Sequence, residues 1–188
     1  MIGMILAAAT SLSTPALVAR CDLLASHPSD PDRMTSGVES ADVDMSAAET
    51  ACLLAHQAAP EHARTAYHLG RVIHYQKRHA QALPYLEKAA AAGYRQSIFV
   101  LGYVLSLGEA EVPKDICRTL SLWRRSAALD HPWSGYYLVD LQLAGAFAGC
   151  PQPVAREEYA RLLDLAAKGI TVSASAGRVE ALAAKAAR

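Results

Sequence analysis

Residues 67–94 read YHLGRVIHYQKRHAQALPYLEKAAAAGY, and this stretch decides the fold. Apolar residues recur at helical spacing, a short polar break follows at residues 77–79, and a second, alanine-rich helical run closes on Gly93. The pattern predicts a hairpin of two helices, over residues 63–76 and 80–92. A single helical hairpin cannot bury both of its faces, so further units are expected to stack against it.

The same pattern returns twice further along the chain. YHLG at 67–70 is echoed by FVLG at 99–102 and, less well, by YYLV at 136–139, in steps of 32 and then 37 residues. The extra residues of the second step fall in the loop at 106–115, which is where a stacked helical hairpin tolerates an insertion. The hairpin is therefore one of about three, and the array leaves no room for a separate catalytic domain.

Length and composition agree with an all-helical protein. With 188 residues the chain is long enough for one domain with a substantial core but short for two. Just over half of the residues are apolar, alanine is abundant and only two are phenylalanine, which favours many small helix contacts. The expected fold is an all-α superhelix, or solenoid, of about three helix-turn-helix repeats with flanking helices.

The chain divides into a leader and a repeat domain. Residues 20–43 contain prolines, aspartates and serines with little periodicity, which predicts irregular backbone. The repeat domain is expected over residues 44–188, with a first helix at 44–58 and another at 95–107. In total we expect seven or eight helices between residues 44 and 187, no sheet, and a right-handed superhelical drift.

Small residues recur where a first helix is expected to cross its partner. Gly70 and Gly102 lack a side chain, so the two backbones can approach closely, and in the third unit Val139 replaces this glycine. Alanines at Ala66, Ala82 and Ala89 fit close crossings too. The space between helices is expected to be filled by Leu69, Ile73, Leu86, Leu101, Leu105, Leu122 and Leu138.

These residues carry a resemblance to a known family. The spacing of the tetratricopeptide repeat is matched between residues 63 and 94 by Ala66, Leu69, Gly70, Ala82, Leu86 and Ala89. The longer unit LSLGEAEVPKDICRTLSLWRRSAALDH, residues 105–131, resembles the related Sel-one-like repeats, whose loop typically ends in valine-proline. The resemblance spans residues 63–170 and is degenerate in the third unit. It implies an α-solenoid that serves as an adaptor for protein partners, and it implies no substrate.

The N-terminus has the character of a secretory signal peptide. An apolar run at residues 1–9 is followed by small and polar residues up to Ala19, although no lysine or arginine precedes the run. The run is shorter than the ~20 residues that span a bilayer, and Arg20 precedes Cys21 where a lipoprotein signal needs a small residue. We expect residues 1–19 to be removed, no stable membrane anchor, and export, with a bacterial periplasm as the destination.

Four cysteines remain after such cleavage. An even number in an exported chain predicts two disulfides, with three pairings possible; four buried free thiols are the alternative. We expect Cys21 to pair with Cys52, because the leader needs an anchor on the first helix. Cys117 is expected to pair with Cys150, because stacking brings the corresponding parts of adjacent units together.

Other chemistry has weak support. Three histidines fall between residues 68 and 79, but two of them are six residues apart and so lie on opposite sides of a helix, and the cysteines lack zinc-site spacing. Ser134, His131 and Asp140 have no G-x-S-x-G context for a hydrolase, and there is no glycine-rich phosphate loop. We assign no catalytic residue, metal site or cofactor.

The remaining signal is aromatic. If the first helices line the concave face, as the resemblance implies, that face presents tyrosine, tryptophan and arginine, which are typical binding anchors. The expected binding residues are Arg71, His74, Tyr75, Tyr103, Trp133, Tyr136 and Asp140. Tyr67 and Phe99 fit packing between repeats equally well. Arg71, Tyr75 and Tyr103 are expected to line one continuous surface and to be at least partly exposed.

The expected function is that of an exported adaptor which binds a protein or peptide in its groove. Acidic and basic residues number 18 each and are mixed along the chain, so nucleic acid is not an expected partner. The alternatives are a non-catalytic accessory protein or structural oligomer of the cell envelope, or an enzyme built on the same solenoid.

Overall fold

The computed structural model describes residues 12–108 and 111–188, which contain nine α-helices and no β-strand. The predicted all-α class is therefore confirmed. Residues 1–11 of the predicted signal peptide and residues 109–110 of the predicted loop lie outside the described residues. The helices are α1 (Thr14–Ala25), α2 (Met45–Ala58), α3 (Ala63–Tyr75), α4 (His79–Ala91), α5 (Arg95–Leu107), α6 (Ile116–Ala128), α7 (Pro132–Leu143), α8 (Tyr159–Gly169) and α9 (Ser173–Ala186), with a 3₁₀ turn η1 (Arg156–Glu158).

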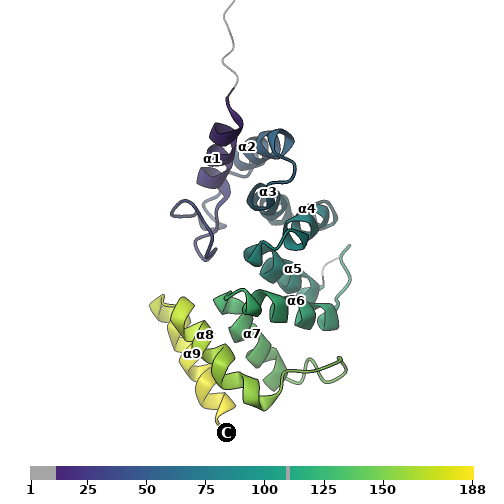
Figure 1. The fold of residues 1–188 in the computed structure, drawn as a ribbon, viewed down its shortest axis with the longest axis vertical. Coiled ribbons are helices and arrows are strands. Elements are labelled where there is room, and N and C mark those ends of the chain that lie inside the picture. Colours follow the sequence, from purple (N-terminus) through teal and green to yellow (C-terminus); the bar gives the residue numbers. More distant parts are fainter. Residues whose placement is uncertain (1–11, 109–110) are drawn as a thin grey trace, which may run out of the picture.

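The helices stack in the order of the chain, with α1 and α2 at one end and α9 at the other (Figure 1). Each helix packs against the next, and α1 also contacts α3 while α7 also contacts α9. Eight of the α-helices lie between residues 44 and 187, as predicted. Consecutive packing of this kind is consistent with a helical solenoid.

Local sequence sets the helix ends. The side chains of Asp44 and Asp115 accept hydrogen bonds from backbone N–H groups in the first turns of α2 and α6, at 3.0 and 2.9 Å. The ring of His62 caps α3 in the same way. Gly93 follows α4 with a φ of +87°, and its counterpart Asp130 follows α6 with a φ of +59°, a left-handed conformation that aspartate tolerates.

The glycines of the first two units lie at close helix crossings, as predicted. A Cβ atom on Gly102 would lie 2.6 Å from Nε1 of Trp123, the fully buried tryptophan of α6. A Cβ atom on Gly70 would lie 3.0 Å from the side chain of Leu86 on α4. Each first helix therefore packs directly against the second helix of its own hairpin.

The third unit makes this close approach one turn earlier. Val139 occupies the position of the missing glycine and is fully buried. A Cβ atom on Gly135 would collide with the carbonyl oxygen of Leu162 on α8. The position of close contact on α7 is thus four residues earlier than on α3 and α5. Because an α-helix has 3.6 residues per turn, the face of α7 that makes the contact is rotated by about 40° relative to the corresponding face of those two helices.

Both predicted disulfides are present, so the alternative of four free thiols is wrong. Cys21 and Cys52 are fully buried and join α1 to α2 with their Cα atoms 4.6 Å apart. Cys117 at the start of α6 joins Cys150 in the segment after α7. The bonded residues are 31 and 33 positions apart, and a loop of that length stabilises a fold by about 3–4 kcal/mol.

The N-terminal segment differs from the prediction. Residues 20–25, expected to be irregular, form the second half of α1, because Cys21 and Ala25 are one turn apart and both bury against α2. The irregular leader, defined here as residues 26–44, starts only after Ala25. Residues 14–20 are exposed or half-exposed, and burial begins at Cys21.

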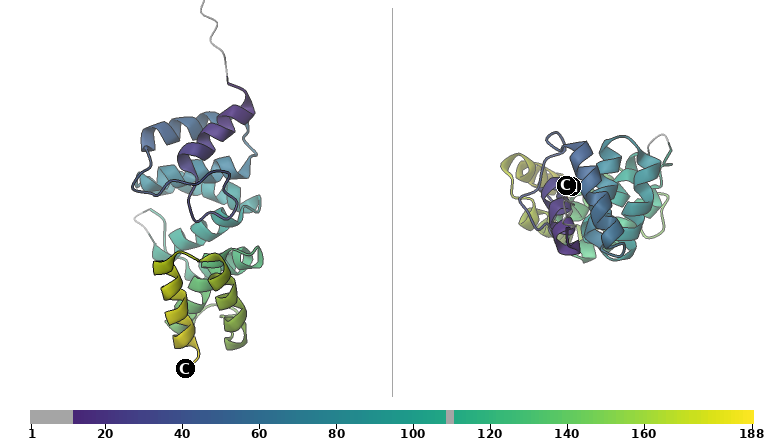
Figure 2. Two further views of the ribbon diagram at one scale, coloured as in Figure 1. Left: turned by 90° about the vertical axis from the view of Figure 1, so that its left-hand side faces the viewer. Right: turned by 90° about the horizontal axis from the view of Figure 1, so that it is seen from above.

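The leader returns along one side of the stack. In Figure 2 it lies over α3 and α5, on the same side as α8 and α9.

Among the described helices, none combines the length and apolarity needed to cross a bilayer.

Candidate binding cleft

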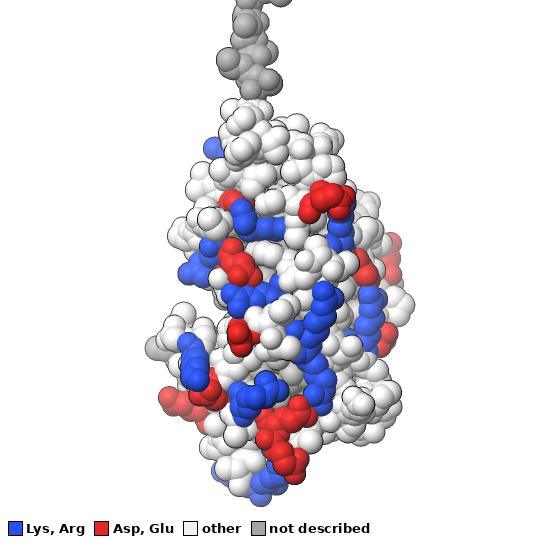
Figure 3. Space-filling model, in the orientation of Figure 1, with Lys and Arg blue, Asp and Glu red and all other residues white. Residues whose placement is uncertain are grey.

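The first helices of the three units, α3, α5 and α7, form the floor of a cleft. The leader lies on one side of this floor and α9 on the other, and the surface is hollowed between them (Figure 3). A pocket of about 260 Å³, called the cleft pocket below, is lined by His27, Ser29, Tyr67, Arg71, His74, Tyr75, Gln96, Phe99, Val100, Tyr103, Trp133, Tyr137 and Arg178. An adjoining hollow of about 680 Å³ shares Ser29 and Trp133 with it and extends between the leader and α8–α9.

The structure brings five of the seven predicted binding residues together in the cleft pocket: Arg71, His74, Tyr75, Tyr103 and Trp133. Tyr103 is 37% exposed, as predicted for a surface residue. Tyr136 and Asp140 do not line this pocket, and Tyr136 is only 7% exposed. The neighbouring Tyr137 takes the place predicted for Tyr136, which agrees with the rotation of α7 described above.

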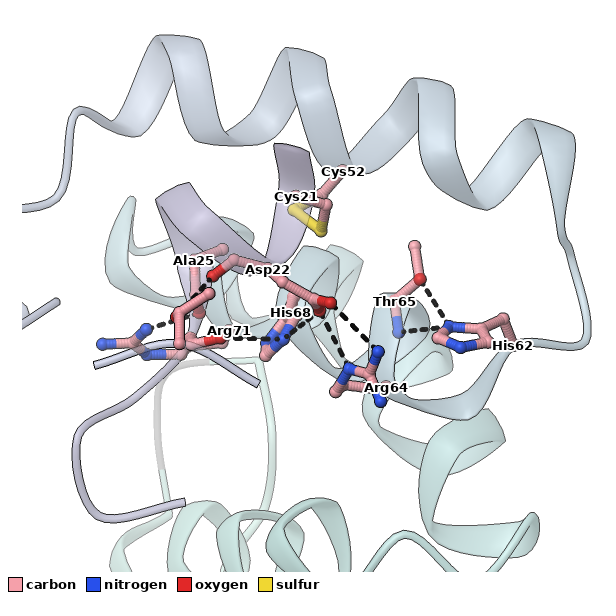
Figure 4. The surroundings of a disulfide bond; sticks show 11 residues. Cys21, Asp22, Ala25, Cys52, His62, Arg64, Thr65, His68 and Arg71 are labelled. Carbon is pink, nitrogen blue, oxygen red and sulfur yellow. Dashed lines mark hydrogen bonds and ion pairs between the residues drawn. A yellow bond between two sulfur atoms is a disulfide. The ribbon is translucent and has the colours of Figure 1, made fainter. Parts of the chain in front are cut away.

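The prediction that Arg71 is partly exposed is wrong, since its exposure is 2%. The leader covers it, and its guanidinium group donates to the carbonyl oxygen of Ala25 at 2.6 Å and to that of Val38 at 2.8 Å. Its Nε donates to the hydroxyl of Tyr75 at 2.9 Å. Figure 4 shows Arg71 reaching from α3 to the end of α1. Arg71 thus fastens both the end of α1 and the leader to α3, in addition to lining the cleft pocket.

Aromatic rings from successive units are in contact along the floor. Tyr137 lies centrally, with its ring centroid 5.9 Å from those of Phe99 and Tyr103 and 6.1 Å from that of Trp133. Aromatic pairs at such separations stabilise one another beyond their burial. Burial also raises the pKa of the Tyr137 hydroxyl, so this side chain stays neutral at physiological pH. The floor is therefore a rigid, mostly apolar surface.

The charged groups at the cleft pocket are positive. Arg178 on α9 is exposed, and its guanidinium carbon lies 5.7 Å above the ring of Trp133 and 5.1 Å above that of Tyr136. No aspartate or glutamate is found among the residues that line the cleft pocket. His27 does not add charge at neutral pH, because burial and the nearby Arg71 lower its pKa to about 4.

One polar group behind the wall of the cleft pocket is weakly paired. The hydroxyl of Tyr67 is buried, with an exposure of 0%, and it has no hydrogen bond within 3.5 Å, although the side chain of Gln96 lies close enough to affect its pKa. A buried hydroxyl without a close partner loses much of its hydration without compensation. Burial raises the pKa of Tyr67 far above its usual range, so the group is a neutral donor and acceptor.

The leader is bound to the array through acidic residues. The Tyr94 hydroxyl donates to Asp30 at 2.6 Å, next to the start of α5. Arg95 forms a two-pronged ion pair with Asp32, with both bonds at 2.8 Å. Charge-assisted bonds of this geometry are among the stronger polar contacts in proteins.

A second polar cluster lies beside the Cys21–Cys52 disulfide (Figure 4). Asp22 of α1 is 4% exposed; it accepts two bonds from Arg64, at 2.9 and 3.0 Å, and its carboxylate is 3.2 Å from Nε2 of His68. Burial acts to raise the pKa of Asp22, but the hydrogen bonds from His68 and Arg64 outweigh it and lower the pKa to about 2. The cluster ties α1 to α3, so His68 has a structural role.

The residues considered for catalysis are not arranged as a triad. Nε2 of His131 is hydrogen-bonded to Oε1 of Gln96 at 2.6 Å, and its ring stacks on Phe99 at 4.5 Å. The hydroxyl of Ser134 makes no hydrogen bond. His74 and His79 approach each other, with their Nδ1 atoms 3.0 Å apart. Within the part of the chain that the structure describes, no group of three histidine, cysteine, aspartate or glutamate side chains is placed to hold a metal ion.

The sequence matches no protein-family model and no curated protein. The fold and the cleft therefore define the protein by class, as an all-α array of stacked helices with two disulfides and an aromatic cleft on one side.

Proposed function

We propose that this protein is an exported helical-repeat adaptor of the tetratricopeptide or Sel-one-like kind, which binds a protein or peptide partner in its cleft. The observation that carries the proposal is the cleft pocket itself. Three successive first helices contribute aromatic side chains to it, and rigid aromatic side chains are typical binding anchors.

The size of the cleft pocket supports a side chain as its occupant. Its volume of about 260 Å³ is below the ~300–1,000 Å³ typical of small-molecule sites. The adjoining hollow of about 680 Å³ continues along the leader, so an extended segment of a partner has room on both sides of Trp133. The right-handed superhelical course of the array is part of this proposal.

Export to a periplasm is supported by the N-terminal half of α1. Removal of residues 1–19 would take away mostly exposed positions of α1, whereas burial begins at Cys21, just after the proposed cleavage site. Two disulfides are typical of proteins that fold in an oxidising compartment.

Site-specific photocrosslinking in the organism that makes the protein tests this function. A photoreactive phenylalanine analogue is placed at Tyr103 in the cleft or, as a control, at half-buried Tyr159 on α8, which lies outside it. We expect a discrete crosslinked partner from position 103 that is absent from position 159. The same products from both positions, or none from position 103, contradict the proposal. A signal-peptide processing assay by mass spectrometry of the secreted chain tests export separately.

A further inference from the structure

We propose that the partner segment recognised by the cleft is acidic, with an aromatic or large apolar side chain seated in the cleft pocket and a neighbouring carboxylate bound by Arg178. This inference rests on the proposed function and specifies the chemistry of its ligand. It is drawn from the way in which the array binds its own leader and from the charge of the cleft pocket.

The leader is an acidic segment, folded in consecutive turns over residues 27–32, that is already bound on this side of the array. Its sequence HPSDPD, residues 27–32, is held by the hydroxyl of Tyr94 on Asp30 and by the two-pronged contact of Arg95 with Asp32. Tyrosine and arginine at the first helices thus recognise carboxylates of an irregular segment. The cleft pocket lies next to this segment, because His27 and Ser29 of the segment form part of the wall of the pocket.

The cleft pocket presents the same two residue types without a carboxylate of its own. Arg178 forms cation–π contacts with Trp133 and Tyr136 and has a weak hydrogen bond, at 3.5 Å, to the Tyr136 hydroxyl. Arg71 adds a second positive charge, which is buried and whose hydrogen bonds go to two carbonyl groups and a tyrosine. A basic segment would be repelled here, whereas a carboxylate gains charge-assisted bonds.

Two observations indicate an inserted side chain as well as surface charge pairing. The walls are aromatic, and the volume of about 260 Å³ is in the range of a single large side chain and its flanking backbone.

Selection from a random 12-residue phage-displayed peptide library tests the inference on the purified, disulfide-bonded full chain. We expect enrichment of peptides that place an aromatic residue within a few positions of aspartate or glutamate. Enrichment of basic peptides, or of aromatic peptides without acid, overturns this inference and leaves peptide binding intact. Selection that enriches no peptide contradicts the proposed function itself.

Fluorescence anisotropy with the best selected peptide, fluorescein-labelled, then tests the role of Arg178. We expect Arg178→Gln to weaken binding at least tenfold and Arg178→Lys to weaken it less. The control Arg161→Gln removes an exposed charge of α8 that lies outside the cleft and should leave affinity unchanged. Replacing the peptide carboxylates by amides should weaken binding to the normal chain but not to Arg178→Gln. Equal affinity of the normal chain and Arg178→Gln for the acidic peptide refutes the assignment.

Discussion

Replacing Arg71 by methionine tests whether this residue fastens the leader to the array. Methionine keeps much of the side-chain volume but removes the bonds to the carbonyl oxygens of Ala25, at the end of α1, and of Val38, in the leader, at 2.6 and 2.8 Å. It also removes the bond to the Tyr75 hydroxyl, which is half-buried and can bond water instead, so that bond is not counted. Hydrogen bonds from charged groups contribute about 1.5–3 kcal/mol each. The lower figure applies here, because the variant also removes the cost of burying a guanidinium group. We therefore expect a loss of about 3 kcal/mol in the free energy of unfolding.

Two assays measure this loss. Thermal melts followed by circular dichroism should show a melting temperature lower by about 6–12 °C, at about 2–4 °C per kcal/mol for a chain of this size. Limited trypsin digestion should cut faster after Arg33, an exposed residue of the leader, because a loosened leader is more accessible. Tyr75→Phe, which removes only one partner of Arg71, serves as a control and should cost about 1 kcal/mol or less. If the Arg71→Met variant has the same melting temperature as the wild-type protein and is cut by trypsin equally slowly, Arg71 does not hold the leader.

Three further predictions concern packing, pH and the first disulfide. Gly102→Ala should lower the free energy of unfolding, measured by chemical denaturation, by about 1–3 kcal/mol because the helices cross closely there. The control Gly177→Ala in α9, where an added Cβ atom meets nothing, should be neutral or stabilising. Equal effects of the two substitutions would refute the argument from close crossing. Burial lowers the pKa of His131 to about 3, so the unfolded chain, titrating near 6.5, gains protons first and stability falls as the pH drops. Between pH 7 and 5 the wild-type protein should lose about 2 kcal/mol of unfolding free energy through His131, and the His131→Gln variant should not show this loss. An identical dependence of stability on pH in the two proteins would contradict the role of His131. Replacing Cys21 and Cys52 together by serine should lower stability by about 3–4 kcal/mol, and an unchanged denaturation midpoint would show that the bond contributes nothing.

The sequence predicts the features that depend on periodicity and local geometry. Gly70 and Gly102 recur at the same position of two units, and the structure places both at tight crossings. The disulfide pairs follow from which segments need an anchor and which parts of adjacent units stack. The glycine position recurs along the chain, so one sequence contains enough copies to reveal it.

Features that depend on long-range packing were not predicted. Arg71 has the spacing of a surface anchor, and only the return of the leader over α3 buries it. Tyr137 replaces Tyr136 in the cleft pocket because the close approach of α7 moves to Gly135, a shift that its sequence echo YYLV conceals. Arg178 belongs to α9, outside the recurring sequence pattern of residues 67–139, so no periodicity points to its place beside Trp133.

The most direct test of the central claim uses the two tryptophan indole signals in a ¹H–¹⁵N NMR spectrum. Trp133 lines the cleft pocket, whereas Trp123 is fully buried and donates its indole N–H to the carbonyl oxygen of Phe99 at 3.0 Å. On titration with the best selected peptide, we predict a saturable shift of the Trp133 signal that Arg178→Gln weakens, with the Trp123 signal little changed. A peptide that binds the protein while the Trp133 signal stays in place would contradict binding in the cleft.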